Sequence, residues 1–258
     1  MKLKSNKYKY LLTNIEFVGY GHPDRFADYL AEKISNYFYS LNKKTKTAIE
    51  IMVTRDKIFL GGEIGRVLSP TEKENIEAIV YNTINEIYGE KWWPNHKNVK
   101  VINNIKGQSP ELSKIVDNED DEFITGDQGV SYGFWYYPRM NLINDVYNTL
   151  NKVIKAFDLA PDYKALLSDN TLLISFCGLK YEYKEFLEKS IKDLLKNWGF
   201  NVKINKLDWN IAGPLADTGM VGRKLMVDSF GTGIPHGGRS ILRRWRNRIF
   251  NSPRLKAN

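Results

Sequence analysis

Residues 19–30, GYGHPDRFADYL, combine side chains that suit the edge of a phosphate and metal site. Pro23 suits the first turn of a helix, and Asp24 suits the positive end of a helix. A plain helix start needs no histidine, yet His22 stands directly before these two residues. The run is therefore either a helix start alone or the edge of a site that holds phosphate and metal.

A glycine-rich run, AGPLADTGMVGRKLMVDSFGTGIPHGG (212–238), contains a second set of candidate ligands. The adjacent Arg223 and Lys224 suit a polyphosphate, because an arginine binds two oxygens while a lysine acts as a point charge. Asp217 is a possible cation ligand, and it could share magnesium with Asp24. The chain has no GxxxxGK[ST] run, so it is not a P-loop enzyme. A cluster of structural turns is the alternative interpretation.

Two shorter runs, KGQSPEL (106–112) and TGDQGVSYGF (125–134), lie in an acidic, loop-like stretch. In the second run Gly126 and Gly129 bracket Asp127, and glycines let backbone amides approach a ligand. A β-turn with a polar tip explains the same residues, and this motif alone favours that simpler interpretation.

The spacing of apolar residues predicts the helices and strands that must position these loops. The predicted helices are 24–41, 69–89, 141–157 and 182–200. The predicted strands are two within 46–65, joined by a tight turn at 55–57, and one in each of 98–105, 171–179 and 201–207. Ser69 is the expected cap of the second helix, with a proline directly after it.

This order of elements predicts an α+β fold of repeated small units, in which helices cover one face of antiparallel or mixed sheets. We assign residues 13–104 to the first unit and 105–138 to a linker with loop motifs. Residues 139–238 form the second unit with the glycine-rich loop, and 239–258 form a basic, divergent tail.

Composition excludes several classes of protein. The 258 residues are 42% hydrophobic and 26% charged, which argues against disorder over most of the length. Cys177 is the only cysteine, so neither an intrachain disulfide nor a thiolate zinc cage is possible. The first residues lack a sustained apolar run, which predicts a cytoplasmic protein with no signal peptide or membrane span. The net charge of +8 is concentrated in residues 239–258, so a nucleic-acid partner is not favoured.

A set of short runs resembles, in the same order, the signatures of the S-adenosylmethionine synthetase family. The runs are GHPDR, GGEI, KGQSPEL, GDQG, and GPLADTGMVGRKLMVDSFG with a following HGG. The resemblance covers about residues 13–238. It implies repeated α+β units around a pseudo-threefold axis. It also implies the formation of S-adenosylmethionine from ATP and L-methionine, with Mg²⁺ and K⁺ as cofactors and with release of phosphate and pyrophosphate.

The resemblance implies roles at the phosphate end of the site. The implied catalytic residues share contact with the ATP phosphates: His22, Lys164, Arg223 and Lys224. Asp24 would bind magnesium, and Glu50 in TAIEIMV matches an acidic position near the potassium site. Arg25 stands where the family has a lysine and keeps the charge.

Other positions are implied to hold methionine or adenosine: Glu63, Gln108, Asp127, Trp209 and Asp217. The chemistry fits these residue types, because a thioether sulfur has no proton to lose and the reaction needs no base. Catalysis then depends on positioning the reactants and on stabilising the charge of the leaving triphosphate. The family also implies a homodimer with the active site at the subunit interface. A sheet face that helices do not cover is consistent with one, because it has to be buried elsewhere.

The resemblance ends after residue 238. Family members continue into a stretch of the form GGGAFSGKD and a third α+β unit, whereas residues 239–258 read RSILRRWRNRIFNSPRLKAN. We therefore expect a chain truncated before the third unit, with a tail that is solvated, a nucleic-acid arm or the product of a frame change. Codons can be chosen for residues 239–250 such that reading them one base later gives nearly the family sequence after HGG. We therefore favour a frame change over a nucleic-acid arm.

A non-catalytic homologue that binds nucleotide or a full-length partner subunit is the alternative function.

Overall fold

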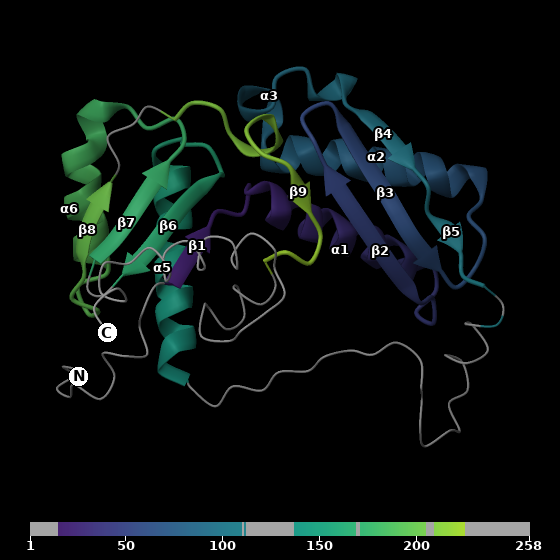
Figure 1. The fold of residues 1–258 in the computed structure, drawn as a ribbon, viewed down its shortest axis with the longest axis horizontal. Helices are drawn as coiled ribbons and strands as arrows, with labels where there is room; N and C mark the ends of the chain where they lie inside the picture. The colour runs from purple at the N-terminus through teal and green to yellow at the C-terminus, as the bar shows by residue number, and fades with distance from the viewer. Residues whose placement is uncertain (1–14, 110, 112–136, 169–170, 205–208, 225–258) are drawn as a thin grey trace, which may run out of the picture.

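The computed structural model describes residues 15–109, 111, 137–168, 171–204 and 209–224. Within them the chain forms two sheets, and each sheet has helices packed against one face (Figure 1). The predicted α+β class is therefore confirmed. Among the described helices, none is both long enough and apolar enough to cross a membrane.

Sheet B consists of five strands, four from the first half of the chain and one from a late segment. Its path is β4 (Lys100–Asn103), β3 (Lys57–Ile64), β2 (Thr47–Val53) and β9 (Gly219–Met220), and β5 (Lys106–Gly107) also pairs with β3. Strands β2 and β3 form the predicted antiparallel hairpin, whereas β4 and β5 run parallel to β3. The sheet is therefore mixed.

Sheet A has the order β1 (Ile15–Val18), β6 (Tyr163–Ser168), β7 (Thr171–Phe176) and β8 (Asn201–Ile204). Its first three strands are antiparallel neighbours, and β8 runs parallel to β7. The helices α5 (Tyr137–Ala156) and α6 (Lys184–Leu194) supply buried side chains to its core, among them Leu150 and Ile191.

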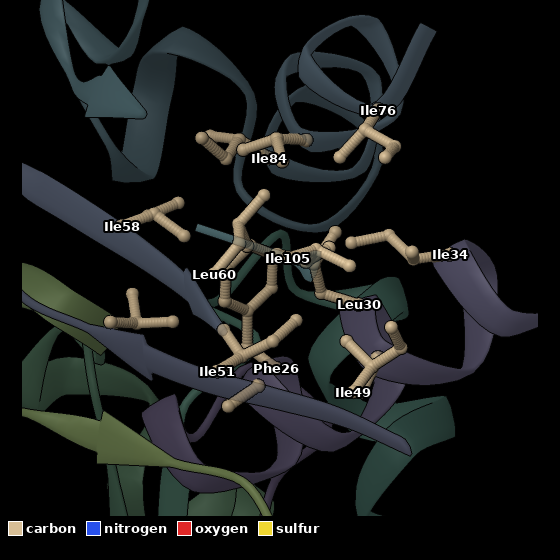
Figure 2. Close-up of a cluster of buried hydrophobic side chains, with 14 of the residues drawn as sticks. Phe26, Leu30, Ile34, Ile49, Ile51, Ile58, Leu60, Ile76, Ile84 and Ile105 are labelled. Carbon is tan, nitrogen blue, oxygen red and sulfur yellow. The ribbon is translucent and has the colours of Figure 1, made fainter. Parts of the chain in front are cut away.

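The core of the first unit lies between sheet B and the helices α1 (Pro23–Leu41) and α2 (Pro70–Ile87). Figure 2 shows Phe26, Leu30 and Ile34 of α1 beside side chains of β2 and β3. These three residues are fully buried, and burying a side chain of this size contributes about 1.5–3 kcal/mol. The core therefore fixes α1, and with it the loop at its N-terminus.

Local signals place the helix ends. Ser69 caps α2, and it forms a capping box with Glu72 as the sequence predicts for a Ser-Pro start. Short helices follow: α3 (Gly89–Trp92), then the 3₁₀ turns η2 (His96–Asn98), η3 (Tyr181–Tyr183) and η4 (Gly213–Leu215). His96 is buried, and its ring Nδ1 lies 3.0 Å from the carbonyl oxygen of Trp93.

Each sheet includes one strand that is distant in sequence from the other strands of that sheet. Strand β1 precedes the elements of sheet B in sequence but pairs with β6 of sheet A, while β9 follows the elements of sheet A and pairs with β2 of sheet B. Figure 1 shows β1 and β9 on either side of the start of α1, between the two sheets. The proposed division into units at residues 104 and 138 stays a prediction. Because β1 and β9 each pair with the other sheet, neither sheet is built from one continuous segment of the chain.

Candidate phosphate-binding site

The start of α1 positions His22 and Asp24. His22 is the N-cap of the helix, and its Nδ1 accepts a hydrogen bond from the backbone N–H of Asp24 at 3.1 Å. An accepting Nδ1 places the ring proton on Nε2. Burial, and after it the charge of Lys224, lowers the pKa of His22 to about 3, against the opposing effect of Asp24. His22 is therefore a neutral hydrogen-bond donor at neutral pH.

The carboxylate of Asp24 is at the centre of the site. It is almost fully buried, and Lys224 Nζ lies 2.6 Å from its Oδ2. Its Oδ1 accepts from the backbone N–H of Met220 at 3.0 Å and lies 3.4 Å from a guanidinium nitrogen of Arg223. Folding thus brings the candidate loops at 19–30 and 212–238 into contact across nearly 200 residues of sequence.

Two motif glycines let the backbones of these loops approach. A Cβ at Gly219 would lie 2.1 Å from the carbonyl oxygen of Pro23, and one at Gly21 would lie 2.5 Å from the ring of Pro161. Real Cβ atoms do not approach this closely. Three segments meet there: the start of α1, the turn before β6, and β9 with its flanking residues.

Lys164 extends the positive charge of the site. It lies on β6 opposite Val18 of β1, and its charge helps to lower the pKa of His22. The structure therefore brings together four residues expected to contact phosphate: His22, Lys164, Arg223 and Lys224. An anion at the N-terminus of a helix also gains from the helix dipole.

Asp162 is a buried group that the sequence analysis did not single out. One of its oxygens accepts from the backbone N–H of Gly213 at 2.9 Å, and Oδ1 has no hydrogen-bond partner within the described structure. Burial raises the pKa of Asp162 to about 7, and the charge of Asp217 acts in the same direction. Its place two residues before Lys164, in APDYK, is the signal that could have identified it.

Tyr88 was also missed, and it links two of the loops. Its hydroxyl donates to the carbonyl of Gly21 at 2.7 Å, and its ring lies against Gly213. It packs edge-on against Trp93 in the core of sheet B. No sequence signal distinguishes this tyrosine from other aromatic residues at a helix end.

The residues expected at the potassium site and at the methionine and adenosine end lie elsewhere. Glu50 and Glu63 are exposed on the face of sheet B opposite α1, one on β2 and one on β3. Gln108 follows β5, where its backbone N–H donates to the carbonyl of Ile64. Asp127 lies outside the described residues. Within one chain, Glu50 and Glu63 thus lie on the face of sheet B opposite α1, whereas the phosphate cluster lies at the start of α1.

Trp209 and Asp217 flank the η4 turn. The indole N–H of Trp209 donates to the carbonyl of Ile211 at 2.6 Å, and the ring packs beside Ala212 and the buried Cys177. Asp217 is exposed, with its Oδ1 accepting from the backbone N–H of Thr218. Cys177 is a buried free cysteine.

The described residues contain no cluster of three or more His, Cys, Asp and Glu side chains that could hold a metal ion. Magnesium needs only one or two carboxylates where substrate phosphates supply further oxygens. A single carboxylate such as Asp24 would bind magnesium tightly only together with a polyphosphate. The sharing of magnesium between Asp24 and Asp217 stays a prediction.

A family model agrees with the first half of the chain. The model described as S-adenosylmethionine synthetase, N-terminal domain, matches residues 9–110. That range contains the start of α1 and all of sheet B except β9.

Curated relatives extend the match over most of the chain. A protein named S-adenosylmethionine synthase from Zymomonas mobilis is 29% identical, over 89% of this chain and 67% of its own length. One of the same name from Mycoplasma capricolum is 28% identical, over 92% of this chain and 68% of its own length. The chain thus spans about two thirds of the length of these relatives.

A solved structure has the same fold. Its title is "Structure of an Unusual S-adenosylmethionine synthetase from Campylobacter jejuni", and it superposes with a TM-score of 0.66 at 23% identity. The match covers 87% of this chain and 66% of that chain. The two-sheet arrangement is therefore shared beyond the sequence motifs.

Proposed function

We propose that the chain is a methionine adenosyltransferase of the S-adenosylmethionine synthetase family, because the family model, the curated relatives and the solved structure all point to that family. Its substrates would be ATP, L-methionine and water, and its products S-adenosylmethionine, phosphate and pyrophosphate, the last two formed by hydrolysis of the expelled triphosphate. One observation carries the proposal: three cationic side chains and a neutral histidine meet at the start of α1. That is a site for an anion of high charge.

The residues suit the departure of a triphosphate. When the methionine sulfur attacks the 5′ carbon of the ribose, the C–O bond to the triphosphate breaks and negative charge grows on the leaving oxygen. Arg223, Lys224 and Lys164 would stabilise that charge, and the Nε2–H of His22 would donate to a phosphate oxygen. No residue has to act as a base, because a thioether sulfur has no proton to lose.

Two cations are part of the proposal. Asp24 would hold magnesium with the phosphates, and magnesium supplies further charge neutralisation when bound. Glu50 would contribute to a potassium site, and its exposed carboxylate on β2 is compatible with that role. The remaining chemistry rests on the side chains of the chain itself.

An activity assay tests the proposal directly. The purified chain, incubated with ATP, L-methionine, Mg²⁺ and K⁺, is expected to form S-adenosylmethionine, with a reaction lacking methionine as the control. ATP binding without any product would contradict the enzymatic role. It would favour instead a non-catalytic homologue that binds nucleotide or a full-length partner subunit.

We also propose a homodimer joined through the exposed face of sheet B. Met52, Phe59 and Met220 are each 37–42% exposed there, and Met52 pairs with both of the other two across neighbouring strands. Covering this face would bury apolar area, which contributes about 25 cal/mol per Å². It would also bring Glu50 and Glu63 of one subunit toward its mate, where an active site at the interface would need them.

Phe59→Lys is expected to shift the chain from dimer to monomer in sedimentation at micromolar concentration, because a buried, unpaired lysine opposes association. Val67→Lys is the matched control, since Val67 is exposed outside the sheet. A wild-type chain that is monomeric and fully active would contradict both the dimer and the shared active site.

A further inference from the structure

Both oxygens of the Asp24 carboxylate already have partners among the described residues. Lys224 occupies Oδ2 at 2.6 Å, while the Met220 N–H and Arg223 share Oδ1 at 3.0 and 3.4 Å. The side chain of Asp24 is 2% exposed, so water does not screen these contacts. A cation that binds this buried carboxylate therefore competes with Lys224 and Arg223 for its oxygens.

The same contacts restrain the two cations. Lys224 is 12% exposed and Arg223 is 40% exposed, so Lys224 is the more completely held of the pair. A polyphosphate that binds these side chains must compete with a buried carboxylate for their hydrogen bonds. Asp24 also repels an anion at short range, because like charges in a weakly screened site interact strongly.

A divalent cation removes both obstacles together. It neutralises the Asp24 carboxylate and releases Lys224 and Arg223, which can then bind phosphate oxygens. By thermodynamic linkage, the polyphosphate raises the affinity of Asp24 for the cation by the same factor by which the cation raises the affinity for the polyphosphate. We propose that Asp24 makes this site select a polyphosphate that arrives with a divalent cation, by neutralising Arg223 and Lys224 until a cation replaces them. This inference rests on the proposed function for the position of the polyphosphate.

Asp24→Asn provides the first test. Asparagine keeps an oxygen for the Met220 N–H but loses the charge that holds Lys224 and Arg223. With a metal chelator present, the variant is expected to bind inorganic triphosphate at least about fivefold more tightly than wild type. Added Mg²⁺ should tighten triphosphate binding by wild type and have little effect on the variant. Calorimetry measures both affinities without requiring turnover.

Asp56→Asn is the matched control. Asp56 is an exposed carboxylate paired with Lys57 at 3.4 Å in the β2–β3 turn, so its replacement changes the net charge equally. It should leave triphosphate binding unchanged under both conditions. Equal gains in Asp24→Asn and Asp56→Asn would assign the effect to net charge and overturn the inference.

Lys224→Gln tests the reciprocal effect and does not depend on the folding of the first variant. With its main partner removed, Asp24 should bind Mn²⁺ alone at least about fivefold more tightly than in wild type, as measured by water proton relaxation. Lys73→Gln, an exposed lysine on α2, is the control for charge. Loss or no change of Mn²⁺ affinity in Lys224→Gln would overturn the inference.

The outcomes separate this inference from the proposed function. A wild-type chain that binds triphosphate equally well with and without Mg²⁺ supports an anion site but overturns the selection by Asp24. A wild-type chain that binds triphosphate under neither condition contradicts the proposed function itself.

Discussion

Replacing Arg223 and Lys224 together by alanine is expected to weaken the binding of magnesium-complexed ATP by about 100-fold or more. Each side chain offers a charge-assisted hydrogen bond to phosphate, and such a bond typically contributes about 1.5–3 kcal/mol. Each single substitution should therefore cost about 10- to 150-fold in affinity. The two residues share Asp24 as a partner, so the effect of the double variant should differ from the sum of the two single effects.

The fold should tolerate these substitutions. Arg223 and Lys224 follow β9 and contact α1 through the Asp24 carboxylate, and neither belongs to a hydrophobic core cluster. Thermal unfolding should show a loss of stability, because the substitutions leave the buried Asp24 carboxylate without its cationic partners. Calorimetry below the unfolding transition then measures the loss of ATP affinity. Lys73→Ala on α2 controls for the loss of one positive charge. Wild-type ATP affinity in both single variants would rule out the assignment of this cluster as the phosphate site.

The helices and the β2–β3 hairpin could be predicted from the sequence because their signals are local. Apolar spacing identifies α1, and a Ser-Pro start with Glu72 three residues after Ser69 identifies α2. Both signals depend on residues within one or two turns of each other. The family runs likewise identified His22 and Asp24 without any knowledge of the fold.

Strands that depend on distant partners could not be predicted. Strand β1 covers four residues and β9 two, and each pairs across a long stretch of sequence. Strand β6 lies within APDYKALLS, whose proline and charged residues are typical of a loop. Hence the exchange of strands between the sheets, which assembles the site, is not visible in any one segment.

Contacts within the site could not be predicted from the sequence for the same reason. The buried state of Asp162 depends on Gly213, about 50 residues later, and on the packing of both sheets around the start of α1. A side chain is sterically excluded at Gly219 only because Pro23 lies against it. Such requirements belong to the tertiary structure, whereas composition and periodicity report only what neighbours in the chain favour.

The contribution of Asp162 to stability is expected to fall as the pH rises from about 4 to about 7, through the titration of its carboxyl group. Burial raises the pKa of this carboxyl from 3.8 to about 7 in the folded chain. In that window the unfolded chain has released the proton while the folded chain still binds it, so raising the pH favours unfolding. A pKa difference of this size corresponds to about 4 kcal/mol at most, fully lost above pH 7 and recovered below pH 4.

Asp162→Asn isolates this effect from other titrating groups. His22 acts in the opposite sense, because its pKa is lowered to about 3 and its neutral folded form becomes costly as the pH falls below 6.5. His22 is present in both proteins, so the difference between their free energies of unfolding largely removes its contribution. Measured in urea from pH 4 to pH 8, that difference should shift in favour of Asp162→Asn as the pH rises and then level off near pH 7. Asp56→Asn, an exposed control, should leave the slope of wild type unchanged. Parallel curves for wild type and Asp162→Asn across this range would show that Asp162 keeps an ordinary pKa, and that water or a bound cation offsets its burial.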